Sequence, residues 1–147
     1  MPINVDPIRV RELVGAMTDA LRRLQELGTI TESEFLSDFR STESAKYLFI
    51  VVTEAAIDLC NHIVSRQGGR APESYADCFA VLVDLGLISD ELSLRLRQMT
   101  RFRNLLVHLY WRVDNRRVYE LIHTSLGDVE AYIRAVLDWM SATDQGH

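Results

Sequence analysis

The stretch from Thr42 to Arg66 constrains the fold more than any other part of the chain. Its middle, YLFIVVTEAAIDLC at positions 47–60, carries apolar side chains nearly all the way round a helix. A helix of this kind lies at the centre of a core, or is covered by a partner molecule as well. The Gly68–Gly69 pair is suited to end it. We therefore expect the other helices to pack around this one.

Shorter helical segments precede this helix. Asp6 can cap a first helix, Pro7 suits its first position, and Gly28 can end it. Thr31 and Glu34 have the spacing of a capping box, which predicts a short turn of helix over ESEFLSDF.

Three further helical segments follow the long helix. One is predicted over about Ser74–Leu85, with Gly86 as its stop, and another begins at Ser89. The last covers about Arg116–Ser141, with a kink expected near Gly127. No convincing alternation of apolar and polar residues indicates a β-strand. The chain is therefore predicted to be all-α, an up-and-down bundle of four to five helices.

Composition and charge are those of one small globular domain, residues 1–147, with 48% hydrophobic and 25% charged residues. The opening MPINVDPIRV lacks the pattern of a signal peptide, and no apolar run reaches the roughly 20 residues of a membrane span. Cys60 and Cys78 lack metal-binding spacing and are interpreted as isolated, reduced core residues in preference to a disulfide. We expect a cytoplasmic protein without a membrane segment, metal ion or cofactor.

Positive charge is concentrated in one stretch, although the net charge of the whole chain is −5. Between Gln98 and Arg117 the only acid is Asp114, and the only lysine of the chain is Lys46. Guanidinium groups make planar, two-point contacts with phosphate, but for an arginine cluster a solvated helix face is the more ordinary explanation. The arginines of this stretch are Arg101, Arg103, Arg112, Arg116 and Arg117.

Within that stretch, RFRNLLVHLYWR at positions 101–112 holds a polar set suited to acid–base chemistry. At about 100° per residue, Asn104 and His108 project within roughly 40° of each other, so Asn104 can orient the His108 ring. Arg103 and His108 diverge by about 140°, so one straight helix does not bring them together. A kink, or a second copy of the helix across a dimer axis, would do so. Alternatively, His108 caps a carbonyl and Tyr110 packs at the core edge.

Four polar residues of the long helix can face one side of it: Glu54, Asp58, Asn61 and His62. One carboxylate pair and one histidine make a weak metal site. We expect the two carboxylates to pair with arginines or to contribute to a polar cleft. His123 and His147 have no evident partner and are interpreted as surface residues.

The segment RNLLVHLY resembles the Arg-x4-6-His-x-Tyr motif of the HEPN superfamily, specifically of HepT-like toxins. The resemblance covers most of the chain. The segments VVTEAAIDLCNHIV, PESYADCFAVLVDLGLISDEL and MTRFRNLLVHLYWRVDNRRVYELI follow one another in the order that this family shows. Asn104 stands directly after Arg103, where the family favours a polar residue.

The resemblance implies a helical homodimer that is a metal-independent endoribonuclease, the toxin of a type VII-like toxin–antitoxin system. Arg103 and His108 would be the catalytic pair, supported by Asn104, in a cleft between two subunits. Tyr110 would accept AMP from a minimal nucleotidyltransferase antitoxin, which would silence the toxin, or would bind RNA. The surrounding arginines, Arg101, Arg112, Arg116 and Arg117, would hold RNA. The alternative is a non-catalytic helical dimer that binds a nucleotidyltransferase or a nucleotide.

Overall fold

The computed structural model describes residues 3–144, and within them every regular element is a helix. The all-α prediction is therefore confirmed for this part of the chain, whereas four to five helices were too few. The described elements are α1 (Pro7–Leu27), α2 (Glu32–Ser37), α3 (Phe39–Gln67), α4 (Tyr75–Asp84), α5 (Asp90–His108), the 3₁₀ turn η1 (Tyr110–Arg112), α6 (Asn115–Thr124) and α7 (Leu126–Asp144).

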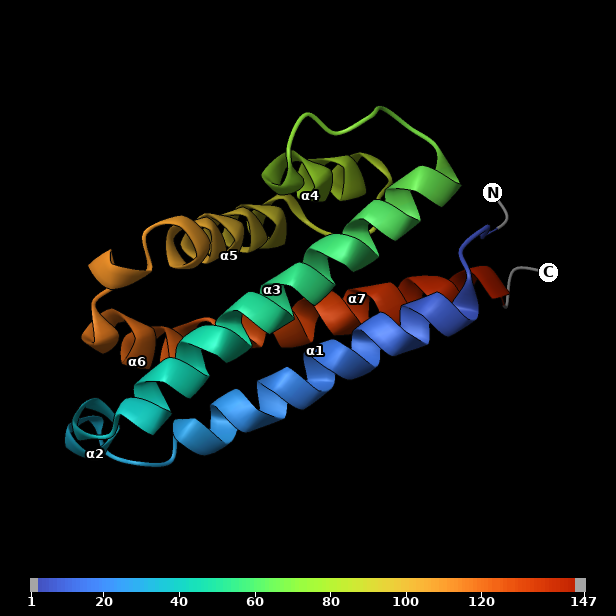
Figure 1. The fold of residues 1–147 in the computed structure, drawn as a ribbon. Coiled ribbons are helices and arrows are strands. Elements are labelled where there is room, and N and C mark those ends of the chain that lie inside the picture. The colour runs from blue at the N-terminus through green and yellow to red at the C-terminus, as the bar shows by residue number, and fades with distance from the viewer. Residues whose placement is uncertain (1–2, 145–147) are drawn as a thin grey trace.

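Helix α3 lies at the centre of the fold, with α1 running antiparallel beside it (Figure 1). Helices α2, α4, α5 and α6 also pack against α3, and the buried Tyr132 of α7 donates a hydrogen bond to the Ala56 carbonyl at 3.0 Å. By length and composition alone α3 is apolar enough to cross a membrane, but 56% of its most apolar window is buried within the fold. The apolar circumference of α3 is thus explained within one protomer.

The helix ends follow the capping signals. The Asp6 carboxylate accepts from the Ile8 N–H at 3.0 Å, and Thr31 with Glu34 forms the predicted capping box. Helix α3 begins three residues earlier than predicted because the Asp38 carboxylate caps it, accepting from the Arg40 N–H at 3.0 Å. Gly68 ends α3 with φ of 81°, in the region that favours glycine.

The last helical region differs from the prediction of one kinked helix. It consists of two helices that separate at Ser125, while Gly127 lies inside the first turn of α7. The Ser125 hydroxyl donates to the Leu121 carbonyl at 2.6 Å, and the Thr124 hydroxyl donates to the Glu120 carbonyl at 3.0 Å. Such side-chain bonds occupy backbone acceptors at the end of α6, which favours a break there.

Cys60 and Cys78 are both free, as predicted, and both fully buried. They are not isolated, however, because their Sγ atoms lie 2.6 Å apart where α3 meets α4. Burial raises the pKa of the Cys60 thiol, and the neighbouring Cys78 raises it further.

Candidate functional site

Helix α5 directs Arg103 and His108 to different sides. The Arg103 side chain is only 17% exposed, and its Nη2 lies 2.8 Å from Glu54 Oε1 on α3. The Nε of Arg103 is buried with no hydrogen-bond partner in the described structure. His108 is the last residue of α5 and is exposed. One protomer therefore holds the guanidinium against α3 while it presents the imidazole to solvent.

Asn104 does not have the partner that its spacing suggested. Its Oδ1 accepts a hydrogen bond from Arg103 Nη1 at 3.0 Å, so the amide orients the guanidinium rather than the His108 ring. Asn104 thus binds Nη1 of the Arg103 guanidinium, and Glu54 binds Nη2. Two polar contacts on a half-buried guanidinium restrict its rotamers, which is what positioning an anion-binding group requires.

A small cleft surrounds this arginine. Glu54, Ile57 and Asp58 from α3, Tyr75 from α4 and Arg103 line a space of about 110 Å³. Glu54 both pairs with Arg103 and lines the cleft, whereas Asp58 only lines it.

Tyr110 lies just past α5, in η1, and is half-buried. Its hydroxyl donates a hydrogen bond to the Glu43 carboxylate of α3. The Lys46 Nζ lies 4.6 Å from the centre of the Tyr110 ring and 3.3 Å from Glu43 Oε1. Burial, reinforced by Glu43, raises the pKa of Tyr110 to about 12, and the hydrogen bond from Tyr110 lowers the pKa of Glu43.

Sequence reasoning missed both Glu43 and Lys46 as parts of this site. Glu43 is 67 residues away from Tyr110 in the chain. The one available signal was Lys46, the only lysine of the chain, which stands in an apolar helix and is 5% exposed. Buried lysines are rare unless they are paired.

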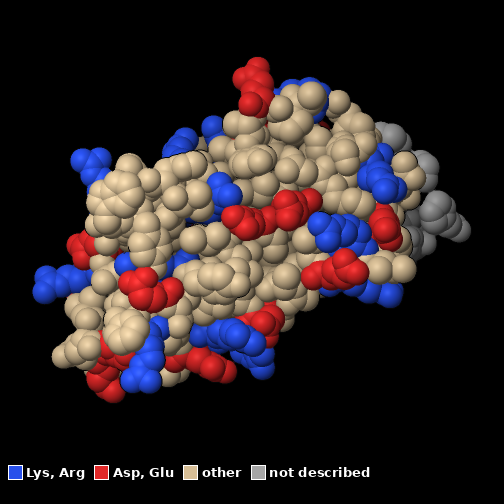
Figure 2. All heavy atoms as spheres, in the orientation of Figure 1, with Lys and Arg blue, Asp and Glu red and all other residues tan. Residues whose placement is uncertain are grey.

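The remaining arginines of the cluster lie along α5, η1 and α6, and all are exposed: Arg101, Arg112, Arg116 and Arg117. Two of them have acidic neighbours, since Arg117 lies 2.9 Å from Glu120 and Arg116 lies 4.0 Å from Glu32. Figure 2 shows basic and acidic groups interspersed on the visible face rather than one continuous positive patch. Because acidic groups lie between them, these exposed arginines can contact only a few neighbouring phosphates of an RNA chain.

The other polar candidates have structural partners. His62 Nε2 accepts from the Asp6 N–H at 3.0 Å, and Asn61 Oδ1 accepts from the Cys78 thiol at 3.2 Å. His123 is exposed but not without partners, because its ring nitrogens lie 2.9 Å from the Tyr119 and Gly28 carbonyls. Among residues 3–144, no group of three or more His, Cys, Asp or Glu side chains is placed to hold a metal ion. His147 lies outside the described residues.

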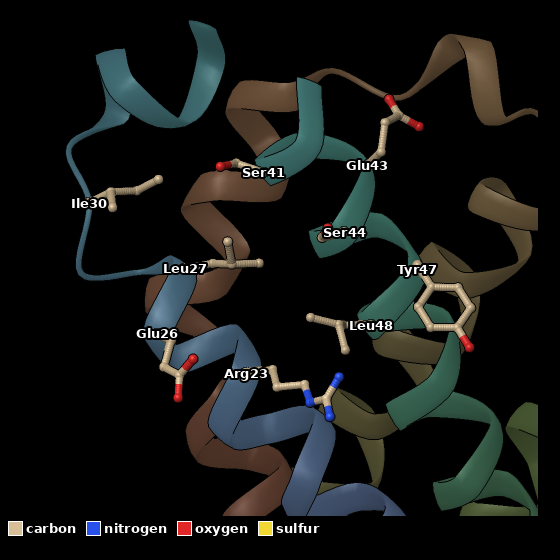
Figure 3. Close-up of a pocket in the computed structure, with 9 residues that line it drawn as sticks. All are labelled: Arg23, Glu26, Leu27, Ile30, Ser41, Glu43, Ser44, Tyr47 and Leu48. Atoms are coloured by element: carbon tan, nitrogen blue, oxygen red, sulfur yellow. The ribbon is translucent and has the colours of Figure 1, made fainter. Parts of the chain in front are cut away.

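A larger hollow, of about 630 Å³, lies between α1 and α3 (Figure 3). Leu27 and Leu48 face each other across it, while the Glu43 carboxylate points away from it. Two of its charged groups, Arg23 and Glu26, stand on α1 and do not converge on one point. The geometry therefore favours the Arg103–Tyr110 region of α5 and η1 as the candidate site.

Comparison with known proteins shows what the chain as a whole is similar to. Residues 17–136 match the family model described as "Ribonuclease HepT-like". The chain is 33% identical to the mRNA nuclease HepT of Shewanella oneidensis over 84% of this chain and 92% of that protein. It is 26% identical to the tRNA nuclease HepT of Aphanizomenon flos-aquae over 97% of each chain.

A solved structure has a similar fold. It is the tri-AMPylated HEPN toxin of Shewanella oneidensis in complex with MNT antitoxin. The TM-score is 0.82 at 28% identity, and the match covers 88% of this chain and 97% of that one. The arrangement of helices around α3 is therefore shared with an AMPylated toxin.

Proposed function

Because this chain belongs to the HepT-like ribonuclease family, we propose that it is a toxin that cleaves RNA without a metal ion, in the cytoplasm. Arg103 and His108 are the residues that carry the reaction. The observation that supports this most strongly is the placement of Arg103, which is half-buried and oriented by Glu54 and Asn104. An arginine that only faces solvent does not need two side chains to fix the orientation of its guanidinium group.

The reaction needs only groups that the chain itself supplies. The RNA 2′-hydroxyl attacks the adjacent phosphorus, the bond to the 5′ oxygen of the next nucleotide breaks, and a 2′,3′-cyclic phosphate remains. His108 transfers a proton, and Arg103 stabilises the charge that develops on the phosphate oxygens. General acid–base catalysis of this kind typically contributes about 10²–10⁴-fold to the rate.

The active form is a homodimer. Arg103 and His108 lie on different sides of one α5, so a second protomer completes the site by bringing its own α5 to the first. Exposed apolar side chains lie within the motif and directly after it, with Leu105 36%, Val107 43% and Trp111 78% exposed. Leu94 and Leu105 project from α5 within roughly 60° of His108, which makes a stripe that a second copy can cover.

Silencing proceeds through Tyr110 and a nucleotidyltransferase antitoxin. This proposal is supported by the solved complex of an AMPylated toxin with MNT antitoxin, because this chain shares the fold of the toxin. An AMP group on Tyr110 adds a negative phosphate and a base two residues from His108. The phosphate pairs with arginines that would otherwise bind RNA, and the base occupies the space that RNA needs.

The test is the chemistry of the RNA ends. Purified protein is incubated with RNA in EDTA, and the fragments are examined for 2′,3′-cyclic phosphate by mass spectrometry. The proposal predicts cleavage with cyclic phosphate ends. A lack of cleavage, together with tight binding of a nucleotidyltransferase or a nucleotide, would favour the non-catalytic alternative.

A further inference from the structure

Tyr110 is not a free surface hydroxyl in this structure. Its Oη donates to the Glu43 carboxylate of α3, and Lys46 of the same helix stands over the face of its ring at 4.6 Å. The Lys46 side chain is only 6% exposed, so its ammonium group is held in place beside Glu43 at 3.3 Å. Two charged groups of α3 thus lie against the Tyr110 side chain, the Glu43 carboxylate at its hydroxyl and the Lys46 ammonium over its ring.

A phenol in this position needs help to act as a nucleophile. Burial and the hydrogen bond to Glu43 raise the pKa of Tyr110 to about 12, so the hydroxyl remains protonated throughout the neutral range. The phenol must therefore lose its proton as its oxygen attacks phosphorus. Glu43 is ionised at neutral pH, because the hydrogen bond from Tyr110 and the nearby Lys46 lower its pKa.

We propose that Glu43 is the general base for adenylyl transfer to Tyr110, and that Lys46 stabilises the negative charge developing on the phenol oxygen. The inference rests on the proposed role of Tyr110 as AMP acceptor. The Tyr110 oxygen bonds to the α-phosphorus of ATP, the bond from that phosphorus to the β-phosphate oxygen breaks, and pyrophosphate leaves. The phenol proton passes to Glu43 and from there to water. No redox change occurs.

The toxin chain therefore contributes a catalytic residue to its own silencing. The partner has to supply ATP and stabilise the leaving pyrophosphate, whereas the acceptor arrives with its base attached. Lys46 contributes because a cation over an aromatic face stabilises negative charge in that ring. Its nearly complete burial makes this contribution larger than at an exposed site.

A test without the partner uses adenosine 5′-phosphorimidazolide, which transfers AMP with imidazole as the leaving group. Labelled tyrosines are located by mass spectrometry. Tyr47 and Tyr75 are internal controls, because they are 65% and 54% exposed and no described residue accepts a hydrogen bond from their hydroxyls. We expect Tyr110 to be labelled faster than both, although it is less exposed.

Substitution of the base should change both the rate and its pH dependence. Glu43→Gln keeps a hydrogen-bond acceptor but not a proton acceptor, and should slow labelling of Tyr110 about 100-fold. The remaining rate should rise about tenfold per pH unit as phenolate forms, whereas the wild-type rate should stay flat near neutrality. Glu43→Asp should restore part of the rate. Glu12→Gln, which removes a comparable carboxylate three residues from Arg9 on α1, should leave labelling unchanged.

The outcomes separate the two proposals. The role of Glu43 as base is overturned if Tyr110 is labelled in Glu43→Gln at the wild-type rate. It is also overturned if the variant is labelled more slowly but its rate is still independent of pH near neutrality. Thermal melting checks that each variant is folded, and if Glu43→Gln is unfolded, Glu43→Ala takes its place and is judged by the same pH profile. The role of Tyr110 as AMP acceptor is overturned if a nucleotidyltransferase with ATP transfers equal amounts of AMP to wild type and to Tyr110→Phe.

Discussion

The Arg103 guanidinium and the Glu54 carboxylate lie 2.8 Å apart and join α5 to the central helix α3. The group proposed to bind the scissile phosphate is thus occupied by a carboxylate in the free protomer. RNA has to compete with Glu54 for that guanidinium, so this ion pair sets part of the affinity for substrate.

The ion pair predicts the effect of Glu54→Gln. Removal of the carboxylate charge should lower KM for RNA by about two- to fivefold, since a half-exposed ion pair contributes roughly 0–1 kcal/mol. The value of kcat should stay within about twofold, because Asn104 still orients Arg103. Asp58→Asn is the matched control, since Asp58 lines the same cleft without an ion pair to Arg103 among the described contacts. A fall in kcat with unchanged KM would contradict this account.

Tyr110→Phe should resist silencing. The substitution removes the acceptor oxygen and keeps the ring beneath Lys46. After incubation with the nucleotidyltransferase and ATP, intact-mass spectrometry should show AMP-sized additions on wild type and none on the variant. RNA cleavage should fall in parallel only for wild type. AMP additions that leave cleavage by wild type unchanged would refute the inhibitory role.

The exposed stripe of α5 predicts which residues the proposed dimer depends on. Leu105→Asp places a charge beside His108 and should convert the dimer to a monomer at micromolar concentration, with loss of RNA cleavage. Leu137→Asp is the control, because Leu137 is similarly exposed at 45% but lies on α7. Light scattering measures both variants. A wild-type monomer that cleaves RNA at the normal rate would remove the need for a second copy.

The burial of the two thiols predicts that they resist alkylation in the folded protein. Cys60 and Cys78 are fully buried, and burial raises the pKa of Cys60, so iodoacetamide should modify neither residue until the protein unfolds. Mass spectrometry across a denaturant series should show alkylation that follows the unfolding transition. Rapid alkylation of the folded protein would contradict this packing between α3 and α4.

Much of the fold could be predicted because it depends on local signals. Asp6, Thr31 and Ser89 cap the helices that they were expected to cap, and the apolar circumference of α3 predicted its central position. A kink near Gly127 was expected within one helix, whereas the structure has two helices that separate at Ser125. A glycine is an obvious signal in a sequence, and a hydroxyl bond to a carbonyl is not.

The site was predictable only in part. The motif indicated Arg103, His108 and Tyr110, and charge indicated that an arginine would pair with Glu54. The partner of Asn104 depends on the rotamer of its neighbour, which helical spacing does not determine. Glu43 is far from Tyr110 in the chain, and only the packing of η1 against the start of α3 brings the two together.

The measurement closest to the central claim is single-turnover RNA cleavage in EDTA by His108→Ala and His123→Ala. His108 is exposed and, in this account, transfers a proton, so its loss should slow cleavage by at least about 100-fold without a change in thermal stability. His123 lies 2.9 Å from the Gly28 carbonyl, so its loss should lower stability and leave the cleavage rate of the folded protein unchanged. Cleavage by His108→Ala at the wild-type rate, or loss of wild-type cleavage on addition of EDTA, would contradict the account.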